Sequence, residues 1–373
     1  MEENKTISRS QLLALGAAAA LSPALRLYPA ASAAIAGRAA WLSALCCLPV
    51  LLVYGWVFCR LVAARREGEG LAELIERALG NTIGRAVLLL YGLWLLLYAG
   101  FVLRAAAARF TVALFPQSDP AFFVLTLGAL CLFASLSSPR ALARTARLLL
   151  PLLLGVILLL LLVSLRQIDA ENLLPLRTED ALPALRGALP VGEVLLVGLY
   201  VPGFLLGAVD AQGGGFRSVS LWLAGMCLLL AALCAAVLGC FGAEITASLT
   251  LPFFTLVRNL VFFRTLERVE ALVVALWLFP DFLLGTMALL AAQRCLRPVA
   301  ALPASEKSAL LRDGRWLYFP GGALAITAGL LLAPNENALT LWSETIIPVG
   351  QYVASGALPL LLALGRKEVA SGQ

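Results

Sequence analysis

The chain contains 373 residues, of which 61% are hydrophobic and 13% are charged, whereas soluble globular proteins carry about 25% charged residues. Its net charge of +6 comes mostly from arginines that flank apolar runs and form no single face, which favours anchoring at a membrane over binding nucleic acid. Because the sequence has no histidine and no CxxC pair, it excludes histidine metal sites, histidine relays and Ser-His triads, and we expect no metal and no cofactor.

Ten apolar stretches predict helices that cross the bilayer, since a spanning helix needs about 20 residues. The first half of the chain holds 7–27, 39–62, 83–108, 121–136 and 142–165. The second half holds 188–209, 218–241, 269–292, 317–333 and 345–364. Two of them, 121–136 and 317–333, are short for a full span, and they are included because each lies between charged loops. We therefore predict an all-α polytopic membrane protein with a single transmembrane domain over residues 1–373.

The N-terminal stretch has a second interpretation, as a cleaved signal peptide. Lys5 and Arg9 precede the apolar run, and Ala31-Ser32-Ala33 resembles a cleavage site. The acidic Glu2 and Glu3 and the nine later spans favour a retained first helix instead.

The charged and amphipathic segments predict the topology. Most of the 28 lysines and arginines fall on one side if the N-terminus is cytoplasmic, so both termini are expected in the cytoplasm. Residues 67–81 place Leu71, Leu74, Ile75 and Leu79 on one face, which predicts an amphipathic helix at the inner surface. Residues 252–263 are apolar but too short to span, and predict an interfacial helix on the outer side.

The division into two blocks of five spans predicts an inverted repeat, made of residues 7–165 and 188–364. An odd number of spans places the second block upside down relative to the first. In LeuT-like transporters of this kind, the first helix of each block is broken at mid-membrane, which frees backbone groups to bind a ligand or ion. Proline and glycine punctuate both corresponding helices, at Ser22-Pro23, Tyr28-Pro29 and Gly198-Leu199-Tyr200-Val201-Pro202-Gly203. We therefore expect helices 1 and 6 to be broken, the alternative being that these residues are simply common in membrane helices.

A few polar residues within the spans are candidates for ligand contact. Asp281 lies near the middle of the eighth span, where a carboxylate needs a partner or a cavity, so it could hold a proton or a cation or be structural. Tyr98 lies at the centre of the third span, and Arg26 in the first is expected to extend outward. The expected ligand site consists of Gly16, Leu21, Ser22, Pro23, Tyr98, Gly198, Tyr200, Pro202, Gly203 and Asp281.

Several short strings carry a resemblance to a known family. They are Ile7-Ser8-Arg9-Ser10-Gln11-Leu12, Ala40-Trp41-Leu42-Ser43, Leu79-Gly80-Asn81-Thr82-Ile83-Gly84, Ala143-Arg144, Leu251-Pro252-Phe253-Phe254-Thr255-Leu256-Val257-Arg258 and Glu267-Arg268-Val269-Glu270-Ala271 leading to Trp277. In their order and spacing they resemble the spore germination B-subunit permeases (the GerAB type) of the amino acid–polyamine–organocation superfamily. The resemblance covers residues 7 to 365, although Asp281 departs from the family pattern.

The resemblance implies a ten-helix inverted-repeat fold in the inner membrane of a spore. It also implies a nutrient-sensing role beside an A-type membrane subunit and a C-type lipoprotein, with a small-molecule ligand such as an amino acid between helices 1, 3, 6 and 8. A secondary transporter coupled to a proton or cation is the main alternative, and a pure assembly subunit is a third. Nothing in the sequence favours an enzyme, because it lacks a P-loop and a nucleotide fingerprint.

Overall fold

The computed structural model describes residues 7–357, except for 67, 210–214, 261–268 and 301–317. Within that part of the chain the structure is helical, and strand pairing is limited to one isolated bridge between Ile7 and Val209. Lys307, Arg312 and Arg315 are among the lysines and arginines whose distribution predicts the topology, and they lie outside the described residues. The last predicted span also continues beyond them.

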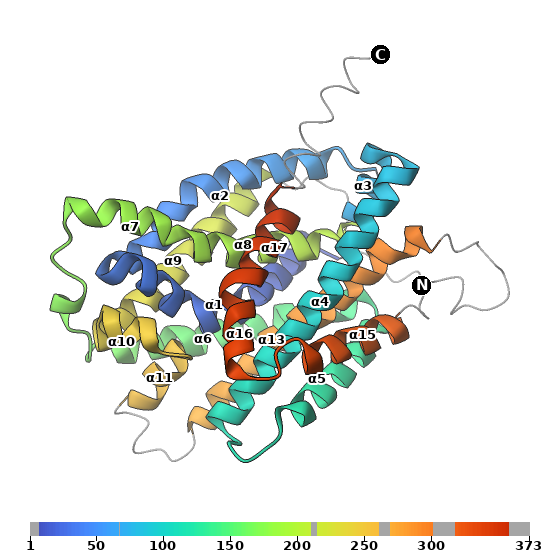
Figure 1. Cartoon of the computed structure of the whole chain (residues 1–373). Helices are drawn as coiled ribbons and strands as arrows, with labels where there is room; N and C mark the ends of the chain where they lie inside the picture. The colour runs from blue at the N-terminus through green and yellow to red at the C-terminus, as the bar shows by residue number, and fades with distance from the viewer. Residues whose placement is uncertain (1–6, 67, 210–214, 261–268, 301–317, 358–373) are drawn as a thin grey trace.

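The helices follow the predicted stretches along the chain (Figure 1). The first half contains α1 (Arg9–Ala36), the turn η1 (Gly37–Ala39), α2 (Ala40–Ala63), α3 (Leu71–Leu79), α4 (Asn81–Ala113), α5 (Pro120–Ser135) and α6 (Pro139–Ser164). The second half begins with η2 (Ala170–Asn172), η3 (Thr178–Asp180), α7 (Ala181–Arg186), α8 (Ala188–Gly203), η4 (Leu206–Ala208), α9 (Phe216–Phe241), α10 (Ala243–Ser248) and α11 (Pro252–Asn259). It ends with α13 (Val269–Val299), α15 (Tyr318–Leu331), α16 (Glu336–Leu341), the π-helical turn η6 (Trp342–Ile346), α17 (Ile347–Gln351) and the π-helical turn η7 (Tyr352–Ala357).

Six helical stretches among the described residues are long and apolar enough to cross a membrane. The first joins α1 and α2 through η1, and the others are α4, α6, Thr178–Gly203, α9 and Leu276–Val299. The apolar helices α5 and α15 are shorter. A described helix overlaps each of the ten predicted stretches, while the count of ten spans and the inverted repeat stay predictions.

Local capping signals explain where several helices begin. The side chain of Ser8 accepts a hydrogen bond from the backbone of Gln11, and Gln11 bonds back to Ser8, which forms a capping box at the start of α1. Asp119 caps α5 and Ser138 caps α6, each followed by a proline in the first turn. The two predicted non-spanning helices are present as α3 and α11, the latter within its described residues.

The helices pack in two groups. In the first, α1 packs against α8 and α9, and α2 packs against α8 and α9 as well. In the second, α4 packs against α5, α13 and α15, and these run side by side in Figure 1. α1 also contacts α13, so the two groups meet along the centre of the molecule.

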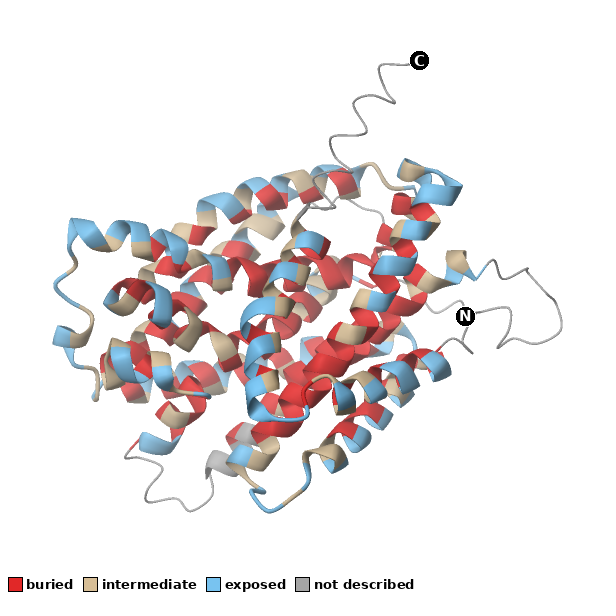
Figure 2. Cartoon of the chain, viewed as in Figure 1, coloured by how far each residue is buried: buried red, intermediate tan, exposed pale blue. Residues whose placement is uncertain are grey.

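Buried positions line the inward faces of these helices, and exposed ones their outer faces (Figure 2). Many exposed side chains are large and apolar, including Leu90, Phe133, Leu148, Leu162 and Leu228. An apolar outer surface of this extent suits contact with lipid rather than with water.

The predicted break in the first helix is wrong. α1 is continuous from Arg9 to Ala36, with Pro23 and Pro29 inside it. α8 also continues through Gly198, and it ends at Gly203, so that the interruption falls at its end. Membrane helices tolerate proline when neighbouring helices surround it, and every residue of α1 from 15 to 26 is buried.

Candidate functional site

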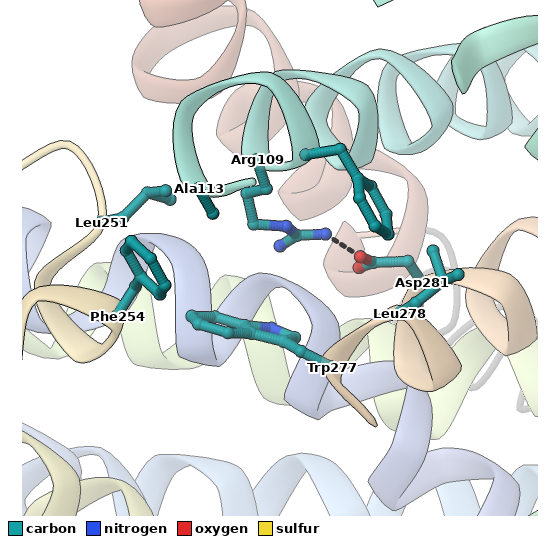
Figure 3. Close-up of a pocket in the computed structure, with 8 residues that line it drawn as sticks. Arg109, Ala113, Leu251, Phe254, Trp277, Leu278 and Asp281 are labelled. Carbon is teal, nitrogen blue, oxygen red and sulfur yellow. Dashed lines mark hydrogen bonds and ion pairs between the residues drawn. The ribbon is translucent and has the colours of Figure 1, made fainter. Parts of the chain in front are cut away.

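A buried carboxylate joins three helices at the centre of the molecule. Asp281 of α13 is 2% exposed, and its Oδ1 accepts a hydrogen bond of 2.5 Å from the Ser22 hydroxyl of α1. Its Oδ2 accepts from Nη2 of Arg109, a residue of α4 that is itself 6% exposed (Figure 3). The side chain of Asp281 therefore links the two helix groups, because α1 belongs to the first and both α4 and α13 belong to the second.

Helical spacing brings these side chains to facing surfaces. Trp277 and Asp281 are four residues apart on α13 and share one face. The guanidinium of Arg109 lies 5.4 Å from the ring centroid of Trp277, within the range of a cation–π contact. The same spacing on α1 places Ser22 and Arg26 on one face.

A second group of buried polar residues lies beside the first. Arg26 is 8% exposed and stacks over the Phe101 ring at 4.9 Å, so it does not extend outward as expected from the sequence. It interacts electrostatically with Tyr98 of α4 and with Glu193 of α8. Tyr98 in turn interacts with Gln351, the last residue of α17.

The burial of these charges is costly in a membrane. A single charge at mid-bilayer costs about 3 kcal/mol or more, and such residues pair with one another or line a cavity. Here Arg109 is paired with Asp281, and Arg26 faces Glu193. Because burying these charged side chains costs so much free energy, a functional role explains them best, and we take this network as the candidate site.

A small pocket adjoins the Arg109–Asp281 pair (Figure 3). The empty space in and around it, open solvent included, is about 270 Å³. Its walls come from the last turns of α4, from α11 and the residue before it, and from α13. The lining residues are Arg109, Phe110, Ala113, Leu251, Phe254, Trp277, Leu278 and Asp281.

The structure brings together only part of the site predicted from sequence. Ser22 and Asp281 are hydrogen-bonded, and Tyr98 belongs to the neighbouring polar group. Leu21 and Pro23 are buried on either side of Ser22.

The remaining predicted residues lie in or against the C-terminal half of α8. Gly16 and Gly198 touch directly, since a Cβ atom at Gly198 would lie 2.6 Å from the carbonyl oxygen of Gly16. Tyr200 packs against Tyr91, with ring centroids 5.5 Å apart. Pro202 and Gly203 are buried, and a Cβ at Gly203 would overlap the Leu71 side chain.

Sequence reasoning missed Arg109. The predicted third span ends at residue 108, whereas α4 continues to Ala113, so Arg109 falls inside the helix. A usable signal was present, because an aspartate in one span calls for a cation in another.

Comparisons with known proteins agree with these observations. A family model described as spore germination protein (spore permease) matches residues 6–336. Among solved structures, a Na⁺-coupled sialic acid symporter in a substrate-bound, outward-open state is similar, with a TM-score of 0.62 and 13% sequence identity. That similarity covers 94% of this chain and 78% of the symporter chain, and it shows a shared LeuT-like transporter fold. No curated protein matches this sequence.

Proposed function

This chain belongs to the spore permease family of spore germination proteins, and from that membership we propose that it is the small-molecule-sensing membrane subunit of a spore germinant receptor. In this role it binds a nutrient, an amino acid, in the inner membrane of the spore, with both termini in the cytoplasm. Binding favours one arrangement of the helices over another, because a ligand shifts a conformational equilibrium by its difference in affinity. An A-type membrane subunit and a C-type lipoprotein respond to that shift and trigger germination.

The buried polar network between α1, α4, α8 and α13 carries this proposal. It links the two helix groups through Ser22 and Asp281, so a ligand that disturbs it changes how the groups are held together. The proposed ligand site is centred on Ser22, Tyr98 and Asp281. We propose that the other predicted residues respond to a movement of α8. This is supported by the close contact of Gly16 with Gly198 and by the packing around Tyr200, Pro202 and Gly203.

A transporter coupled to a proton or cation is the second candidate, favoured by the similarity to a Na⁺-coupled symporter and by the intramembrane Asp281. The contacts of that carboxylate favour sensing instead. Both of its oxygens accept hydrogen bonds from protein side chains, and one of these donors is the permanently charged Arg109. A guanidinium therefore already occupies the place that a coupling cation would take.

Uptake by proteoliposomes that contain only this chain distinguishes the two candidates. For a sensor, we expect saturable binding of a labelled amino acid without accumulation inside the vesicle. We also expect binding to be unchanged when K⁺ replaces Na⁺, because Arg109 already neutralises Asp281. Accumulation against a gradient, driven by Na⁺ or by protons, would instead establish transport.

Replacing Ser22 by alanine tests whether the link between α1 and α13 carries the response. A hydrogen bond to a charged group contributes about 1.5–3 kcal/mol, so Ser22→Ala should raise the half-effective nutrient concentration by about tenfold or more. The readout is the fall in optical density of spores that carry the variant. Ser32→Ala is the matched control, because the Ser32 hydroxyl on the same helix donates to the Gly187 carbonyl at 2.9 Å, away from the site. Equal responses of the two variants would remove Ser22 from the proposal.

A further inference from the structure

Three arginines form a row at the start of α6. Arg140, Arg144 and Arg147 recur at intervals of four and three residues, so they lie along one face of the helix. Arg144 and Arg147 are exposed, and Arg140 is partly buried. The buried positions between them, Leu142 and Ala146, lie on the other side of the helix. This arginine row therefore points away from the core of the protein.

The arginine row has no acidic partner among the described residues. Between Asp119 and Asp169 the sequence contains no aspartate and no glutamate. α6 packs against α1, α9 and α13. Neither α1 nor α9 contains an acidic residue, and Asp281, the acidic residue among the described side chains of α13, is bonded to Ser22 and Arg109. No ion pair or hydrogen bond within the described chain involves the three guanidinium groups.

Other arginines near helix ends do have acidic partners in the part of the chain that the structure describes. Ion pairs join Arg77 to Glu69, Arg85 to Glu76 and Arg294 to Glu73. A carboxylate compensates the charge of each of these guanidinium groups, whereas no described carboxylate compensates the arginine row.

The apolar part of α6 fixes the depth of the arginine row in the bilayer. Residues 148–165, which follow Arg147 directly, contain no charged side chain, and the next charge is Arg166. At 1.5 Å per residue this segment is about 27 Å long, close to the hydrocarbon thickness of about 30 Å. The arginine row therefore lies in the headgroup layer, with Arg147 at its boundary with the hydrocarbon.

The same helix offers a surface for acyl chains. Of the six stretches among the described residues that are long and apolar enough to cross a membrane, α6 is the least buried. Leu148, Leu158 and Leu162 are exposed, and helical spacing places Leu158 and Leu162 on the side of the arginine row. A lipid whose headgroup lies at the arginines thus has an apolar helix face along which its chains extend.

We propose that the arginine row binds the headgroup phosphate of an anionic phospholipid, whose acyl chains lie along the exposed leucines of α6. Phosphate fits because a guanidinium donates two parallel hydrogen bonds to its oxygens, and the three arginines lie within about 10 Å along the helix. A lipid with net negative charge is favoured over a zwitterionic one, because the arginines repel the cation of a zwitterionic headgroup. In the proposed topology this end of α6 is cytoplasmic, where the surface of the membrane is negatively charged. The lipid site is independent of the proposed sensing function.

Native mass spectrometry of the full chain, released from detergent micelles after titration with lipid, tests the site. The probe is dioleoyl phosphatidylglycerol, and dioleoyl phosphatidylcholine, which has the same chains and a zwitterionic headgroup, is the control. We expect the first phosphatidylglycerol to bind at least about tenfold more tightly than the first phosphatidylcholine, since each arginine near an anionic group contributes about fivefold. This preference should shrink as the salt concentration rises. Equal affinities for the two lipids overturn the proposal.

Two triple variants assign the binding to the arginine row. Arg140→Gln, Arg144→Gln and Arg147→Gln together should weaken binding of phosphatidylglycerol by about tenfold or more and leave phosphatidylcholine unchanged. The matched control removes the same charge from exposed arginines between α6 and α8, in a segment that also contains four carboxylates. Its substitutions are Arg166→Gln, Arg177→Gln and Arg186→Gln. The control should bind phosphatidylglycerol within about twofold of the wild type.

The outcomes separate a lipid site from the alternatives. An equal loss of phosphatidylglycerol binding in the two triple variants means that binding follows net charge, and it overturns the site. Unchanged binding in the row variant also overturns it, and loss of a co-purifying membrane subunit in that variant would then assign the arginine row to a protein contact. Thermal unfolding reports whether the row variant folds. If it does not, Arg144→Gln alone should weaken phosphatidylglycerol binding by about fivefold, and no change in that variant contradicts the proposal.

Discussion

Replacing Asp281 by alanine should destabilise the protein by about 3–5 kcal/mol, because it leaves the charge of Arg109 buried without a counter-charge. The loss of stability follows from the burial of Arg109 and Asp281 and not from the strength of the ion pair between them. Two charges in a low-dielectric core gain little net free energy together, whereas either one alone keeps its full desolvation penalty. The free energy of unfolding, from a titration with denaturing detergent, measures the effect.

A double replacement separates these two effects. Arg109→Met with Asp281→Leu removes both charges and fills the space with apolar atoms, so we expect it to be more stable than either single variant. Asp119→Ala is the control for a solvent-exposed aspartate, which caps α5 and should lose only about 1 kcal/mol. If the double variant lost the sum of the two single losses, the residues would not be coupled, and the pair could not link the helix groups.

Alanine at Gly198 should cost about 3 kcal/mol, which is the second large effect that we expect. Its Cβ would lie 2.6 Å from the Gly16 carbonyl oxygen and 3.0 Å from the Ala20 methyl group. Since the first of these contacts is with backbone, rotation of a side chain cannot relieve it, and α1 and α8 must separate. Yield of folded protein and thermal unfolding in detergent report the loss.

Gly155→Ala provides the matched comparison. Gly155 also lies inside a membrane helix, α6, but no atom lies within 4 Å of the position that its Cβ would take. Alanine there should be neutral or stabilising by up to about 1 kcal/mol, because it favours the helix. Similar behaviour of the two alanine variants would mean that α1 and α8 are less closely packed than described.

Hydropathy alone predicted where the helices lie, because the bilayer selects long apolar stretches so strongly. The amphipathic helix α3 was predicted equally well, since Leu71, Leu74 and Ile75 recur on one face at helical spacing and are buried. Membership of the spore germination family was also predicted from the short sequence strings, and it is confirmed. These features depend on residues that are close together in the chain, so a single sequence is enough to predict them.

The candidate site was predicted only in part, because its residues meet through tertiary packing. Ser22 and Asp281 are separated by more than two hundred positions, and nothing local shows that their side chains bond. Arg109 was missed because the predicted third span ended at residue 108, one position before it, whereas α4 continues to Ala113 and Arg109 is paired with Asp281 inside the protein. Arg26 was expected to reach water for a similar reason, yet Phe101 and Glu193 hold it inside.

The two prolines of α1 have a mechanical consequence. Pro23 and Pro29 have no N–H, so the carbonyls of Ala19 and Leu25 lack the donors that they would have in an unbroken ladder of hydrogen bonds. A helix that lacks backbone hydrogen bonds has lower bending stiffness at those points. The less stiff point at Pro23 is next to Ser22, which is hydrogen-bonded to Asp281 of α13, and Gly16, about two turns earlier in α1, packs against α8. We therefore expect a displacement of Ser22 to bend α1 near Pro23, while the segment around Gly16 stays packed against α8.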